Sequence, residues 1–101
     1  MSELIIKATV VRQAPSKSLH RIKITNSARC IFRYGNDRLS VLIYDIEGGE
    51  AKVGEEKRCE IAFLTGDAIS ESISSGDSFE LALANEVVAK GCVTEILCRP
   101  T

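Results

Sequence analysis

The chain has 101 residues, of which 45% are hydrophobic and 27% are charged, and its formal net charge is −1. This length suits one domain with one core, and the near-neutral charge argues against a general electrostatic attraction to nucleic acid or to anionic membranes. No apolar run reaches the roughly 20 residues that a membrane-spanning helix needs, and no cleavage motif follows the N-terminal apolar stretch. We expect a single cytoplasmic domain over residues 1–101, with no membrane partner.

The first half of the chain predicts strands joined by short connections. Alternating apolar residues in ELIIKATVVR (3–12) predict a strand with one fully apolar face. After a loop that contains Pro15, LHRIKI (19–24) predicts a short or irregular strand. RCIFRY (29–34) and RLSVLIYDI (38–46) then predict a β-hairpin whose turn is the intervening GND.

The second half continues in the same way. EGGEAKVGEE (47–56) is polar and predicts a long connection with a tight turn at its Val-Gly pair, and KRCEIAFL (57–64) predicts a strand. TGDAISESISSGDS (65–78) predicts a loop or a short 3₁₀ segment. SFELALA (78–84) and VVAKGCVTEIL (87–97) predict the last two strands, joined by a short bend.

These elements predict an all-β fold, a six-stranded antiparallel closed β-barrel, because short strands alternate with frequent turn signals. With three Phe, two Tyr and no Trp, the interior must be filled mainly by Ile, Leu and Val. We therefore expect a narrow, packed interior in place of a ligand cavity. The last strand should close the barrel, with Gly91 as a bulge or tight corner where a side chain would obstruct bending or close packing.

The four cysteines, Cys30, Cys59, Cys92 and Cys98, lack the paired spacing of zinc sites, and the chain has one histidine, His20. Three alternatives remain for them: buried or half-buried thiols, a disulfide, or a metal or redox role. Cys92 and Cys98 would face the same side of a regular strand about 20 Å apart. That separation is too great for a disulfide between them.

Catalytic groups are not indicated. His20 lies in a predicted loop without an evident nucleophile beside it, and the acids at 55, 56 and 60 have the pattern of a solvated turn and strand face. The glycines are turn glycines, because no helix follows them to cradle a phosphate. We expect no enzyme activity, no metal, no cofactor and no bound nucleotide.

Several segments in order resemble the C-terminal β-barrel domain of the translation elongation factor Tu family. They are the opening strand IIKATVV, the Arg29 to Phe32 segment, the Val-Gly-Glu turn at 53–55, Gly-Asp-Ser-Phe-Glu-Leu at 76–81, and the closing strand 88–97. The resemblance implies a stand-alone barrel that works by docking, as the family's barrels dock on an exchange factor, tRNA or their own GTPase domain. No phosphate-binding Gly-x-x-x-x-Gly-Lys-Ser/Thr loop is present, so GTP hydrolysis is excluded. Arg29-Cys30 and Ala84-Asn85-Glu86 replace the family's Arg-Pro and Gly-Gly-Arg.

Charge is distributed unevenly along the chain. The first 40 residues hold eight basic and two acidic residues, a net charge of +6, and the remainder carries −7. Either strand order mixes these charges, or they form a basic face that docks an acidic partner or RNA. The candidate binding residues on this face are Lys17, Arg21, Lys23, Arg29 and Arg33.

The function expected from the sequence is therefore a non-enzymatic binding module for a protein partner, such as a bacterial inhibitor or immunity-type protein. The alternative is an RNA- or tRNA-binding module that uses the basic face.

Overall fold

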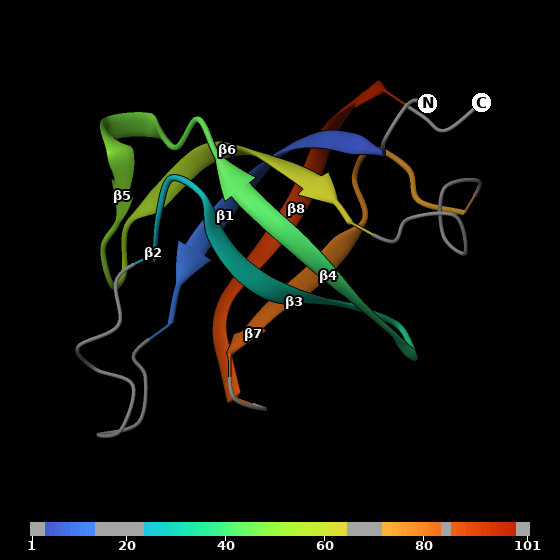
Figure 1. Cartoon of the computed structure of the whole chain (residues 1–101), viewed down its shortest axis with the longest axis horizontal. Helices are drawn as coiled ribbons and strands as arrows, with labels where there is room; N and C mark the ends of the chain where they lie inside the picture. Colours follow the sequence, from blue (N-terminus) through green and yellow to red (C-terminus); the bar gives the residue numbers. More distant parts are fainter. Residues whose placement is uncertain (1–3, 14–23, 65–71, 84–85, 99–101) are drawn as a thin grey trace.

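The computed structural model describes residues 4–13, 24–64, 72–83 and 86–98 (Figure 1). The elements in chain order are β1 (Ile5–Arg12), β2 (Ile24–Thr25), β3 (Ala28–Tyr34), β4 (Asp37–Tyr44), the 3₁₀ turn η1 (Glu47–Gly49), β5 (Glu50–Ala51), β6 (Glu56–Phe63), β7 (Ser78–Leu83) and β8 (Glu86–Cys98). Within these residues no helix has the length and hydropathy required to cross a membrane.

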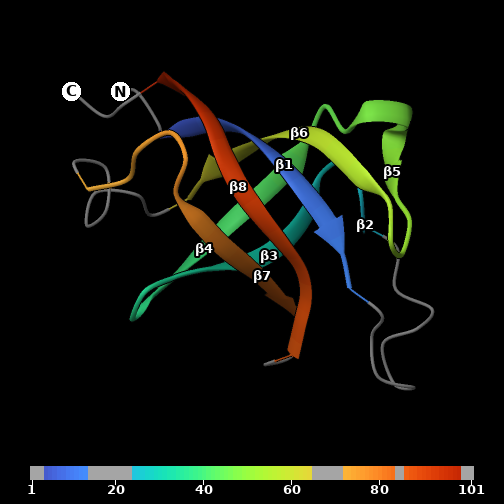
Figure 2. The same ribbon diagram turned by 180° about the vertical axis from the view of Figure 1, so that it is seen from behind.

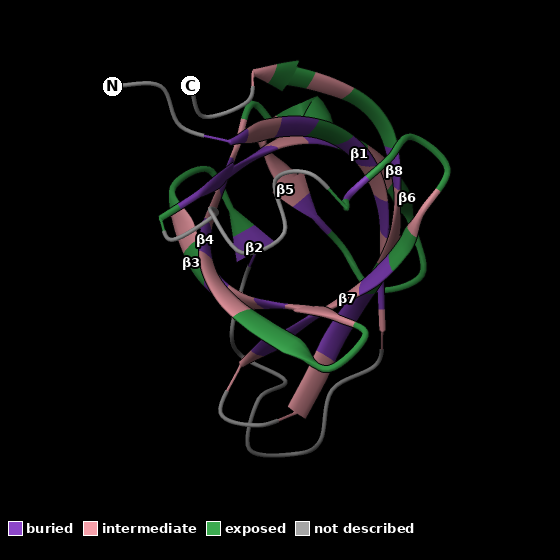
Figure 3. Ribbon diagram, turned by 90° about the vertical axis from the view of Figure 1, so that its right-hand side faces the viewer, coloured by how far each residue is buried: buried purple, intermediate pink, exposed green. Residues whose placement is uncertain are grey.

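Six antiparallel strands close a barrel in the order β1-β6-β4-β3-β7-β8, with β8 returning to β1. Figure 3 looks along the long axis, and the strands surround a common centre. The predicted closed six-stranded barrel is confirmed. β2 and β5 form a separate two-stranded sheet. Of the strand predicted over 19–24, only Ile24 lies within the described residues, and the first half of the loop predicted over 65–78 lies outside them too.

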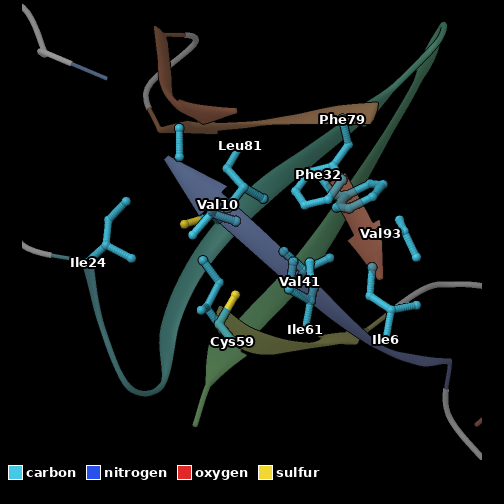
Figure 4. Close-up of a cluster of buried hydrophobic side chains, with 14 of the residues drawn as sticks. Ile6, Val10, Ile24, Phe32, Val41, Cys59, Ile61, Phe79, Leu81 and Val93 are labelled. Atoms are coloured by element: carbon cyan, nitrogen blue, oxygen red, sulfur yellow. The ribbon is translucent and has the colours of Figure 1, made fainter. Parts of the chain in front are cut away.

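The interior of the barrel is filled by the inward-facing residues of the alternating strands (Figure 4). Phe32 is fully buried at the centre of the aromatic packing. Its ring stacks on Phe79 with 4.5 Å between centroids and meets the edge of Phe63 at 4.7 Å. Aromatic contacts of this geometry add to the free energy gained from burial. The three phenylalanines therefore meet in one cluster, and aliphatic side chains fill the space around it, as expected for a narrow interior.

The segment before β7 packs onto this core. Ile73 is fully buried, and the Asp77 carboxylate accepts hydrogen bonds from the Tyr34 hydroxyl at 2.5 Å and from the Ser74 N–H at 2.8 Å. These two bonds lower the pKa of Asp77, because both donors favour the ionised carboxylate. The bond with Tyr34 ties the start of β7 to β3, two strands that are far apart in sequence.

Gly91 lies opposite Phe79 in β7 and Val10 in β1, and it is not a bulge residue. The extra residues of β8 are Val88 opposite β7, and Thr94 and Leu97 opposite β1, so of the two predicted roles of Gly91, a bulge or a tight corner, the bulge is wrong. The expectation of close packing is correct. A Cβ atom at position 91 would lie 2.5 Å from Cζ of Phe79 and 2.8 Å from the Thr9 carbonyl oxygen. Glycine is needed here because the Phe79 ring occupies the space of a side chain.

The β3–β4 turn is shorter than the predicted three residues. Tyr34 pairs with Asp37, so only Gly35 and Asn36 lie between the strands. Gly35 has a φ of 59°, a conformation that glycine adopts without steric cost. Moving Asp37 from the turn into the strand fixes the register of the hairpin, and this register decides which side chains meet on its outer face.

Replacing Gly91 by alanine should lower the free energy of unfolding by about 1–3 kcal/mol, the usual cost of overpacking a core. The added methyl group must displace the Phe79 ring or the Thr9 backbone. Chemical denaturation of Gly91→Ala, Phe79→Leu and the double variant measures this coupling. We expect the double variant to lose less stability than the sum of the single losses. Strict additivity, or a Gly91→Ala variant as stable as the wild type, would contradict the packing assigned to Phe79.

Candidate functional site

A row of charged side chains crosses four neighbouring strands on the outer wall of the barrel. Arg38 of β4 pairs with Arg33 of β3, Arg33 pairs with Glu80 of β7, and Glu80 pairs with Lys90 of β8. Several of their neighbours in the strands are buried in the interior: Phe32 beside Arg33, Phe79 and Leu81 beside Glu80, and Ala89 beside Lys90. Since successive strand residues point to opposite faces, these four side chains point outward. We call Arg38, Arg33, Glu80 and Lys90 the charged row.

The charges of this row are poorly compensated. Arg33 and Glu80 form a salt bridge at 3.8 Å, with about a third of each side chain exposed, and exposed pairs of this kind are weak. Arg33 also faces Arg38, and like charges directly across a sheet repel. Within the described residues, neither Arg38 nor Lys90 forms a salt bridge. The row therefore presents three cations and one anion to solvent.

Two hollows lie on either side of Arg33. The smaller one, of about 210 Å³, is lined by Ile31, Arg33, Arg38 and Ala82, and we call it the arginine hollow. Ile31 and Ala82 are cross-strand partners and supply its apolar floor. The second hollow, of about 380 Å³, is lined by Arg33, Gly35, Ser78, Phe79, Glu80, Lys90 and Gly91. The Glu80 carboxylate thus lines the second hollow, whereas the arginine hollow is lined by two guanidinium groups and no acid.

The candidate binding residues from the sequence are only partly brought together. Arg33 belongs to the charged row, but Arg29 lies four residues away on β3, about 13 Å at the usual rise per residue, opposite Leu42. Lys17, Arg21, Lys23 and the possible catalytic residue His20 lie outside the described residues. The sequence did not identify Arg38 and Lys90 as site residues, because the side chains that lie beside them are set by the pairing of strands and not by their neighbours in the sequence. The two-residue turn in RYGNDR is the signal that could have placed Arg38 opposite Arg33.

The opposite wall carries a groove of about 320 Å³ over β1 and β6 in which the charges pair with each other. A hydrogen bond with the Asp45 carboxyl raises the pKa of Glu60, because that bond is made by the protonated acid. Arg58 donates backbone and side-chain hydrogen bonds that lower the pKa of Glu47. In the part of the chain that is described, no three His, Cys, Asp or Glu residues are arranged to hold a metal ion.

The thiols divide into two inside and two on the outer wall. Cys30 and Cys59 are buried in the core, and desolvation raises the pKa of Cys30 to about 11 and that of Cys59 to about 12. Such thiols stay protonated at neutral pH and react poorly. Cys92 and Cys98 are half-buried, and none of the four forms a disulfide. Of the three roles open from the sequence, packed thiols fit Cys30 and Cys59.

The spacing of Cys92 and Cys98 differs from the expectation for a regular strand. β8 lies beside β1 (Figure 2). Cys92 pairs with Thr9 and Cys98 with Ile5, so the six residue steps of β8 span only four steps of β1. The two bulges between them take up the difference. The cysteines share the outer face at roughly 13 Å instead of 20 Å. This distance still exceeds the reach of a disulfide, which needs Cα atoms within about 7 Å.

No family model matches this sequence, and no curated protein matches it either. The geometry of the outer wall is therefore the basis on which a function can be proposed.

Thiol labelling of the native protein at pH 8 should modify two cysteines quickly and two slowly. A thiol with a pKa near 11 is thiolate in only about one molecule per thousand at this pH, and burial also blocks access to Cys30 and Cys59. Mass spectrometry of the labelled peptides identifies the sites, with the unfolded chain as a control in which all four react. Rapid native labelling of Cys30 or Cys59 would contradict this assignment.

Proposed function

We propose that this protein is a non-enzymatic binding module that docks a protein partner on the outer wall of its barrel. The observation that carries the proposal is the charged row, in which three cations and one anion cross four strands. The interior offers no comparable site, because the inward-facing side chains pack into one cluster. A surface of this kind suits electrostatic steering of an acidic partner.

A protein partner is favoured over RNA by the composition of this wall. Glu80 lies between the cations of the row, so the row is not the continuous cationic groove that tracks a nucleic-acid backbone. Neither hollow beside Arg33 presents an exposed aromatic ring, since Phe79 is buried. Recognition of single-stranded RNA usually combines clustered cations with exposed aromatic stacking platforms. RNA binding is therefore the competing outcome of the test.

We further propose that the chain is a relative of the elongation factor Tu C-terminal barrel, working as an inhibitor or immunity-type partner. The order of the matching segments along the sequence supports this relationship. The barrel fold agrees with it at the level of architecture, which many unrelated functions share. A cytoplasmic location stays a prediction from the sequence.

Charge reversal at the ends of the row should abolish partner capture. We expect the wild-type protein to retain a partner from a lysate of its native cells and Arg38→Glu/Lys90→Glu to lose it, because the acidic surface of the partner would be repelled. Lys52→Glu/Arg58→Glu is the matched control, since it changes the same charge at exposed positions away from the row. Quantitative mass spectrometry of the retained proteins compares the three, after thermal unfolding has shown that each is folded.

The same variants separate the RNA alternative. Binding of tRNA through three cations should weaken by about 20-fold between 50 and 200 mM salt, from a slope near −0.7 per phosphate. A wild-type protein that binds tRNA with this salt dependence and loses it in Arg38→Glu/Lys90→Glu would contradict a protein-docking role. Equal capture of the protein partner by Arg38→Glu/Lys90→Glu and by the control Lys52→Glu/Arg58→Glu would also contradict docking through the charged row.

A further inference from the structure

The arginine hollow combines two features, a pair of cations and an apolar floor. Arg33 and Arg38 line it from adjacent strands, and directly opposite residues in a sheet have Cβ atoms about 5 Å apart. Ile31 and Ala82 line its floor, and Ala82 is only 3% exposed. A ligand that fits must supply negative charge at one end and apolar contact at the other.

The Arg33–Arg38 pair has an energetic cost in the isolated protein. The two arginines carry like charges on directly opposite residues of neighbouring strands, an arrangement that destabilises a sheet. The salt bridge of Arg33 with Glu80 is long, at 3.8 Å, and Arg38 forms none with a described residue. A carboxylate placed between the two arginines would remove the repulsion and accept charge-assisted hydrogen bonds from both.

We propose, building on the docking function above, that the arginine hollow receives an aspartate or glutamate side chain of the protein partner, with an apolar residue of the partner on Ile31 and Ala82. Glu80, which forms an ion pair with Arg33 in the free protein, competes with the partner's carboxylate for Arg33. When the partner binds, its carboxylate enters the arginine hollow, whereas Glu80 lines the second hollow, and Arg38 gains an ion pair that it lacks among the described residues of the free protein.

A carboxylate fits this hollow better than a phosphate does. The volume of about 210 Å³ suits one side chain, and half of the lining residues are apolar. A phosphate group carries up to two charges and a larger hydration shell, and the floor of Ile31 and Ala82 would desolvate it without returning hydrogen bonds. The partner group best matched by charge and lining is therefore an acidic side chain next to an aliphatic one.

A capped peptide, acetyl-Leu-Glu-Leu-amide, is the probe for this site. Titrated into the ¹⁵N-labelled full-length protein, it should shift backbone amide resonances of β3, β4 and β7 around positions 31–40 and 80–82. Acetyl-Leu-Gln-Leu-amide should bind about fivefold more weakly, the size expected for a partly exposed ion pair. Equal binding of the two peptides, or shifts confined to the groove on the opposite wall, would overturn the proposal.

Variants assign the roles of the three charged residues. Arg38→Gln should weaken the Glu peptide about fivefold, and Arg38→Lys about twofold because lysine keeps the charge but loses the planar fork. Glu80→Gln should tighten binding about two- to fivefold by removing the competing carboxylate. Lys52→Gln, an exposed cation elsewhere, should leave affinity within about twofold of the wild type. Unchanged affinity in Arg38→Gln, or weaker binding in Glu80→Gln, would overturn the proposal.

Inorganic phosphate provides the last comparison. Phosphate that shifts the same amides and binds more tightly than the Glu peptide would overturn the assignment to a protein carboxylate.

The proposal for the arginine hollow and the proposed docking function can be contradicted separately. If the Glu peptide does not bind in the arginine hollow but Arg38→Glu/Lys90→Glu still loses partner capture, only the proposal for the hollow is contradicted. If the peptide binds in the hollow but Arg38→Glu/Lys90→Glu captures the partner as well as the wild type does, the docking function of the charged row is contradicted.

Discussion

The barrel depends on the contact between the Phe79 ring and Gly91. These residues face each other across β7 and β8, and the ring lies where a side chain of residue 91 would be. The same ring stacks on Phe32 from β3. One aromatic residue therefore joins three strands, two of which are far from the third in sequence. Closing the sheet in this way packs the described inward-facing side chains into one cluster and places the charged row on the outer wall.

The pairing register of the inward-facing residues determines which outward-facing side chains become neighbours. Once Phe32 and Leu81 are paired as inward residues, Arg33 must lie opposite Glu80, and the short β3–β4 turn brings Arg38 beside Arg33. The repulsion between these arginines is a local cost within an otherwise consistent fold. Local conflicts of this sort are typical of functional surfaces. The carboxyl groups on the opposite wall, by contrast, pair with cations or with each other, so that wall carries less uncompensated charge.

The sequence predicts the strands well because alternation of apolar residues reports one buried face. It also identifies Gly91 as a position of close packing, although the bulges lie at other residues of β8. The bulges of β8 and the pairing of β3 with β7 depend on contacts between segments far apart in the chain, which alternation does not encode. The site was therefore half predictable: Arg33 is found from charge, but Arg38 and Lys90 join it only through register, and Arg29 on the same strand stays apart.

Site-specific photo-crosslinking tests most directly whether this wall is the docking surface. A photoreactive phenylalanine analogue at Ser40, which pairs with Ile31 beside the arginine hollow, should form an adduct with the partner in cells that make the protein. The same analogue at Thr9, on β1 across the barrel from β3, should form none. An adduct from position 9 alone, or equal adducts from both positions, would contradict docking through the charged row.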